Sequence, residues 1–268
     1  MLRTSRTLIA TVSLIVAVPG VAAADWDLMV FGGRSYPTHE ERLVVRLPDV
    51  PPVPGLEITA QGTPEIRGSG GPVFGGALAS AGLFGIEGRV DLVSVDLEFS
   101  GARYDLAFVP PAFGVSTGQL TVGETVLEVD RLNIISVNAR LKTPGPLGLV
   151  ASGGISYLPG FEVSGTVPVA FQLGNIGGLA QPLLRVRVDP EESDHSFGVN
   201  GGAGIRLGGR VGVFAEARVF YFKSYELSLE FDAAQPLVNE LLDNVDTVRF
   251  RPLIVNAVVG LSIRIPGL

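Results

Sequence analysis

The stretch FGVNGGAGIRLGGRVGVFAEARVFYF, residues 197–222, decides how this chain folds. On both sides of the central pair Gly208 and Gly209, every second residue is apolar. The residues that alternate with these apolar ones include Glu216 and Arg218. Successive side chains of a β-strand point to opposite faces, and a two-residue glycine turn suits an antiparallel hairpin. The stretch therefore predicts a hairpin with one apolar face and one face that mixes charged and small residues.

The same alternation recurs along the chain and predicts about eight strands. Their ranges are 26–36, 71–81, 84–104, 132–143, 147–158, 196–208, 210–223 and 252–265. Short and long connections alternate between them, and the long ones cover 37–70, 105–131, 159–195 and 224–251. Short turns at one end and long loops at the other are typical of outer-membrane β-barrels.

The composition indicates which face of these strands meets lipid. Alternation alone fits a soluble barrel with an apolar interior as well as a membrane barrel with a polar one. The chain holds only two lysines, 35 glycines and 46% hydrophobic residues, with a mean hydropathy of +0.39. A polar face rich in glycine and poor in lysine suits a crowded lumen better than a solvated surface.

We therefore predict an all-β fold, a transmembrane antiparallel up-and-down β-barrel with short periplasmic turns and long extracellular loops. Eight strands are expected, and ten remain an alternative. At eight strands the interior is just wide enough for side chains to fill it. The predicted lumen charge network consists of Asp96, Glu98, Arg140, Arg206, Glu216, Arg218 and Arg264.

The N-terminus predicts export. Arg3 and Arg6 precede an apolar run at 8–18 and the small residues that end at Ala24. This is the pattern of a secretory signal peptide over residues 1–24, followed by a barrel domain over 25–268. The alternative, a transmembrane helix, needs roughly 20 apolar residues. Cysteine is absent and the net charge is −7, so neither disulfides nor nucleic-acid binding is expected.

In these features the chain resembles the small outer-membrane β-barrel family of outer-membrane protein A and the opacity proteins. The stretch at 197–222 looks like the penultimate hairpin of that family, and ADWDLMVFGG at 24–33 looks like its first strand. Gly260 followed by spaced hydrophobic residues matches the closing-strand signal, although the chain ends in Pro-Gly-Leu where a terminal aromatic residue is usual. The resemblance implies insertion by the barrel-assembly machinery. No peptidoglycan-binding domain is expected.

Catalytic and metal-binding residues find little support in the sequence. Asp194, His195 and Ser196 are adjacent, which raises the possibility of a lipid hydrolase, but neighbouring strand residues face opposite sides. His39 with two following glutamates lacks the spacing of a metal site. We predict no enzyme activity, no cofactor and no metal.

The fourth long connection contains one further motif, because apolar residues recur at helical spacing over 235–245. It predicts a short amphipathic helix, which is either a lid or partner-binding element or a segment packed on the other loops. The predicted function is a non-enzymatic outer-membrane barrel in envelope integrity or surface contact. A narrow transport or ligand-binding barrel is the alternative, and a lipid-modifying enzyme ranks third. The expected partners are outer-membrane lipids, and the expected state is a monomer.

Overall fold

A computed structural model gives the architecture of the chain. It describes residues 25–38, 40–42, 55–61, 65–112, 115–129, 131–161, 163–173, 176–180, 184–188, 195–223, 225–227, 230–232, 248–250 and 253–267. Among these residues, no helix is long and apolar enough to cross a membrane. The predicted signal peptide at 1–24 and the predicted helix at 235–245 lie outside the described residues.

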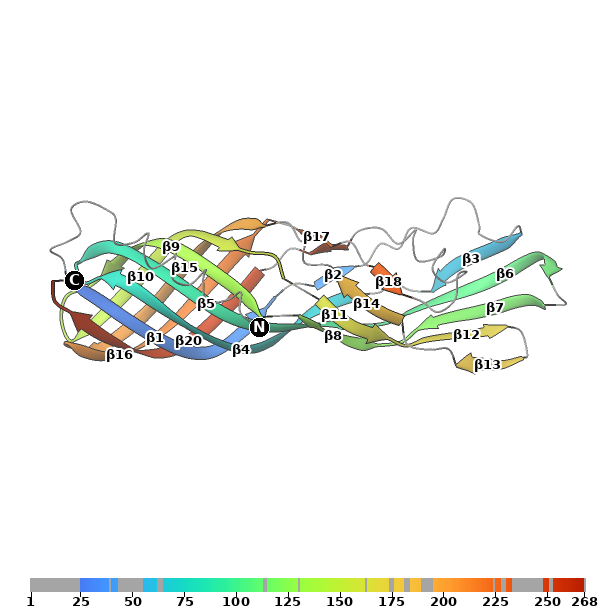
Figure 1. Cartoon of the computed structure of the whole chain (residues 1–268), viewed down its shortest axis with the longest axis horizontal. Helices are drawn as coiled ribbons and strands as arrows, with labels where there is room; N and C mark the ends of the chain where they lie inside the picture. Colours follow the sequence, from blue (N-terminus) through green and yellow to red (C-terminus); the bar gives the residue numbers. More distant parts are fainter. Residues whose placement is uncertain are drawn as a thin grey trace.

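Eight antiparallel strands close into a barrel (Figure 1). They are β1 (Trp26–Pro37), β4 (Glu65–Ser80), β5 (Phe84–Phe99), β9 (Leu132–Lys142), β10 (Leu147–Leu158), β15 (Ser196–Gly208), β16 (Val211–Phe222) and β20 (Leu253–Ile265). Around the barrel the order is β5-β9-β10-β15-β16-β20-β1-β4, and pairing of β4 with β5 closes the ring. The predicted eight-stranded all-β barrel is confirmed.

The outer surface of the barrel is a continuous apolar band to which all eight strands contribute. Its members are exposed by 38% to 74% and include Leu28, Val30, Phe74, Phe84, Ile86, Val137, Leu141, Leu149, Ile155, Phe197, Val199, Ile205, Val213, Val219, Val259, Leu261 and Ile263. Charged side chains lie on the inner face instead, among them Asp27, Glu87, Arg89 and Arg218. An apolar exterior around a polar interior is the arrangement of barrels that cross membranes.

Strands also occupy parts of all four long connections that the sequence predicted as loops. β8 (Thr125–Val129), β11 (Val163–Val167), β14 (Leu184–Val188) and β18 (Glu230–Asp232) prolong the barrel sheet beyond the end of β9, and β2 (Glu40–Arg42) extends β4. A separate sheet runs in the order β13 (Ile176–Ala180), β12 (Val169–Leu173), β7 (Val115–Val122), β6 (Ala102–Ala112) and β3 (Leu56–Gln61). β17 (Tyr225–Leu227) pairs with β19 (Val248–Phe250).

These strands form an extension at one end of the barrel, opposite the short turns and the C-terminus (Figure 1). β4 and β5 run through both parts, and their 16 residues each span roughly 50 Å. The apolar band of a membrane barrel is about 25 Å tall, so strands of this length project beyond it even when tilted. β4 and β5 therefore carry the barrel wall into the extension.

Candidate functional site in the barrel interior

The inner face of the barrel changes character along each strand. On β9 the inward residues read Leu132, Ile134, Ser136, Asn138, Arg140 and Lys142, all of them buried. Leu132 lies toward the extension, and Lys142 lies beside the short turn that leads to β10. The interior therefore has three layers, which we call the apolar plug, the central charge network and the basic mouth.

The apolar plug occupies the end of the barrel next to the extension. Phe220 and Phe222 are fully buried and their rings stack at 6.4 Å between centroids. Other buried apolar residues surround them, among them Val73, Val93, Val95, Leu97, Leu127, Ile134, Leu158 and Ile254. These buried side chains occupy the interior at this level, as expected for an eight-stranded barrel, whose lumen is just wide enough for side chains to fill.

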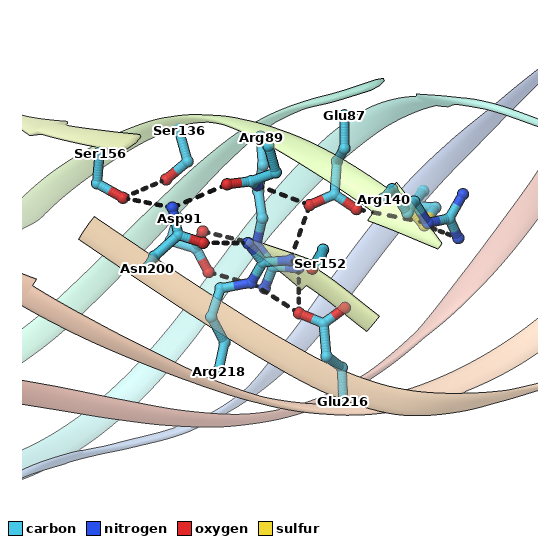
Figure 2. Close-up of polar contacts among 12 residues, drawn as sticks. Glu87, Arg89, Asp91, Ser136, Arg140, Ser152, Ser156, Asn200, Glu216 and Arg218 are labelled. Atoms are coloured by element: carbon cyan, nitrogen blue, oxygen red, sulfur yellow. Dashed lines mark hydrogen bonds and ion pairs between the residues drawn. The ribbon is translucent and has the colours of Figure 1, made fainter. Parts of the chain in front are cut away.

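The central charge network lies below the plug and is built around two arginines. Arg218 donates hydrogen bonds to Glu216 at 2.8 Å and to Glu87 at 2.8 Å. Arg89 donates to Asp91 at 2.7 and 3.0 Å and to Glu216 at 2.9 Å. Figure 2 shows these side chains converging inside the barrel. Each arginine is thus shared by two carboxylates, and all five side chains are almost completely buried.

The two central arginines join opposite walls of the barrel. β5 carries Glu87 and Arg89, β16 carries Glu216 and Arg218, and these strands are four places apart in a ring of eight. The Arg89–Glu216 and Arg218–Glu87 ion pairs therefore cross the full width of the lumen. Such pairs hold opposite walls of the barrel together, and their side chains occupy the lumen between these walls.

Neutral polar residues complete the hydrogen bonding of this network (Figure 2). Arg218 also donates to Asn200 at 2.6 Å and to Ser152 at 2.6 Å. Asn200 donates to Asn138 and to Ser156, and Asn138 donates to Glu87. Buried charges are stabilised when their remaining donors and acceptors are paired, and these residues pair all of the network's carboxylates except for one oxygen atom of Glu87, Oε2.

Two glycines make room for the aromatic rings below the network. A Cβ atom at Gly75 would lie 2.4 Å from the Phe31 ring, and one at Gly260 would lie 2.7 Å from the Phe214 ring. These rings meet edge to face at 6.3 Å, and the Arg89 guanidinium stacks 4.0 Å above Phe31. A larger residue at either glycine would displace a ring that supports a central arginine.

The basic mouth lies at the short-turn end, where a single carboxylate meets several cations. Asp27 is fully buried on β1 and accepts from Lys142 at 3.3 Å. Arg206, Arg264 and Arg140 approach the same carboxylate at 3.5, 3.4 and 3.6 Å. Arg206 also donates to Ser262 and to the carbonyl oxygen of Gly209 in the last short turn.

The structure places five of the predicted lumen residues inside the barrel. Arg140, Arg206, Glu216 and Arg218 are buried, and Arg264 is partly exposed at the mouth. For Asp96 and Glu98 the predicted lumen position is wrong, because both are exposed on the outer side of β5. On that strand Val93, Val95 and Leu97 point inward into the plug, so the apolar face that suggested lipid contact is the inner one.

Five charged residues of the interior were not among the predicted ones: Asp27, Glu87, Arg89, Asp91 and Lys142. The signal for three of them is present in the sequence, because Glu87, Arg89 and Asp91 alternate on one strand face. That face turns apolar from Val93 onward. The prediction that Asp96 and Glu98 face the lumen therefore put Glu87, Arg89 and Asp91 on the opposite, outer face.

The structure does not support the hypotheses of a lipid hydrolase and of a metal site. Ser196 is buried and donates to the carbonyl oxygen of Lys223, whereas His195 is exposed and contacts the Tyr157 ring at 5.6 Å. His39 and Asp194 lie outside the described residues. Within the described part of the chain, no group of three or more His, Cys, Asp or Glu side chains is placed to hold a metal ion.

Comparison with known proteins gives likenesses among solved structures alone. No family model matches the chain. No curated protein matches it either. Among solved structures it is similar to the outer membrane protein OprG from Pseudomonas aeruginosa, with 11% sequence identity and a TM-score of 0.43. That likeness covers 90% of this chain and 97% of OprG.

Proposed function

We propose that this protein is an outer-membrane β-barrel without enzymatic activity, whose filled barrel holds the extension at the cell surface for envelope integrity or surface contact. The apolar outer band supports the membrane location, since a soluble protein rarely exposes such a large continuous apolar surface. The filled interior is the observation that carries the role. A barrel crossed by buried ion pairs and sealed by stacked phenylalanines serves as a rigid anchor, not as a pore.

Planar-bilayer recording distinguishes this role from the alternative, a narrow transport barrel. We expect the purified protein to insert without steady open-channel currents, because the plug and the charge network occupy the lumen in successive layers. A porin of known conductance in the same bilayer is the positive control. A steady, large conductance of the unmutated protein would refute the anchoring role.

Cysteine labelling tests the orientation of the barrel in the outer membrane. The chain contains no cysteine of its own, so each introduced cysteine is the only site that can be labelled. Thr117 is exposed on β7 in the extension, and Gly209 lies in the short turn between β15 and β16. We expect a membrane-impermeant maleimide added to intact cells to label Thr117→Cys and to leave Gly209→Cys unlabelled until the outer membrane is permeabilised. Labelling of Gly209→Cys alone in intact cells would invert the orientation.

A further inference from the structure

The basic mouth carries far more positive than negative charge. Its four cations, Arg140, Lys142, Arg206 and Arg264, share the one carboxylate of Asp27. Within the described residues, Glu87 is the only other carboxylate within ion-pair distance of any of them, at 3.7 Å from Arg140, and it already pairs with Arg218 at 2.8 Å. A surplus of about three positive charges is therefore held in a largely buried space, in a chain whose net charge is −7.

The ion pairs of the mouth are also longer than those of the central network. All four contacts to Asp27 measure 3.3 Å or more, whereas each pair of the network measures 2.9 Å or less. Among the described residues, two donor atoms of Arg140, Nε and Nη1, are buried without a hydrogen-bond partner, and Arg140 lies behind the cavity described below rather than in its lining. Charged donors thus surround Asp27 without being satisfied by it, which is costly unless another acceptor is bound.

A cavity adjoins this cluster. It measures about 460 Å³ and is lined by the ends of Lys142, Arg206 and Arg264 and by the three short turns at 81–83, 143–146 and 208–209. The three cations come from β9, β15 and β20, so they surround the space from different walls of the barrel. The central network closes the lumen above it. The cavity is thus a pocket with a blind end that opens beside the short turns.

We propose that the basic mouth is a binding site for a phosphate group, either inorganic phosphate or a soluble phosphate monoester. Arginine guanidinium groups match the geometry of phosphate oxygens, and lysine supplies a compact additional charge. A phosphate group carries about 1.5 to 2 negative charges at neutral pH, which fits the surplus better than a single carboxylate does. It would supply acceptors for Lys142 and Arg264, which pair with Asp27, and a further acceptor for Arg206, which also donates to Ser262 and to the carbonyl oxygen of Gly209.

The phosphate group of a membrane lipid offers the same chemistry, but the geometry favours a soluble ligand. Lys142 and Arg206 are buried on the inner face, with side chains only 8% and 3% exposed. Lipids contact the outer face, where the apolar band lies. A lipid headgroup would have to fold over the rim and enter the barrel to reach these side chains.

Isothermal titration calorimetry of the purified protein in a maltoside detergent tests the proposal, with inorganic phosphate as the probe and sodium chloride at equal ionic strength as the reference. We expect saturable binding of one phosphate per chain. Lys142→Gln and Arg264→Gln should each weaken it at least roughly tenfold, because each removes a charge-assisted contact. Arg131→Gln, an equal loss of charge at an exposed site between β8 and β9, should leave the affinity unchanged.

A stability measurement covers the case in which a mouth variant folds poorly. Asp27→Asn removes the carboxylate that the four cations share, so its melting temperature should rise with phosphate by several degrees more than that of the unmutated protein. A titration without saturable heat and without this stabilisation overturns the proposal. Binding of dihexanoyl-phosphatidylglycerol but not of inorganic phosphate also overturns it and identifies a lipid site instead. If Arg131→Gln weakened phosphate binding as much as the mouth variants do, the loss of affinity would come from overall charge and the proposal would also be overturned.

Discussion

Replacement of Arg218 by leucine is expected to lower the free energy of unfolding by about 3–5 kcal/mol, the usual cost of removing one partner from a buried ion pair. Arg218 is fully buried and is the shared donor for Glu87 and Glu216. Without it, Glu87 loses its only close cation, since Arg140 is 3.7 Å away. Glu87 then remains in a lumen that water cannot easily enter, whereas Glu216 keeps its ion pair with Arg89 at 2.9 Å.

Urea unfolding in lipid vesicles, followed by heat-modifiable migration on gels, measures this loss. The double variant Arg218→Leu/Glu87→Gln should be more stable than the single one, because it removes the acid that has lost its close ion pair. Arg131→Leu, at an exposed position, is the matched control and should change stability by less than about 1 kcal/mol. An Arg218→Leu barrel as stable as this control would show that the central network contributes nothing to stability.

The strand order was predictable because most barrel strands keep one outward apolar face. β9 is the clearest case, since Val137 and Leu141 face outward and Asn138 and Arg140 face inward, as their alternation predicts. The interior was less predictable, because its inner face is not uniformly polar. On β5 the inward face begins with charged residues and continues as Val93, and alternation cannot tell such a face from one that meets lipid.

Asp27 was missed for a different reason. The sequence around it, WDLMVF at 26–31, is apolar on both faces apart from this one residue, so it gives no alternation to read. Its inward position follows only from the closed ring, in which β1 pairs with β20 on one side and β4 on the other. The four cations that converge on it come from β9, β15 and β20, and no local pattern records that convergence.

The extension was predicted as loops because its strands carry residues that argue against strands. β6 contains Pro110 and Pro111, which cannot donate ladder hydrogen bonds. Its pairing with β7 shifts register between Ala107 and Ala112, around that proline pair. β6 still forms because its residues from Ala102 to Ala107 pair with β7 in a regular ladder on the other side of the shift.

Introduction of arginine at Val259 is expected to destabilise the barrel by about 2–4 kcal/mol in a bilayer, the cost of a cation on the lipid face near the midplane. Val259 is the middle residue of β20 and is 65% exposed on the outer band. Its neighbours across the two ladders are Gly32 and Ala215, which offer an arginine no acceptor. The side chain would have to stretch along the barrel wall to reach water.

Ile263→Arg provides the matched control, because it lies on the same face of the same strand, four residues closer to the short turns. Four residues correspond to roughly 13 Å along the strand, which brings the guanidinium to the headgroup region. Its cost should fall to about 0–1 kcal/mol. Urea unfolding in vesicles measures both. A much larger loss of stability at Val259 than at Ile263 requires an apolar layer around the middle of the barrel. Equal and small losses would mean that the outer band faces water and that the barrel does not span a membrane.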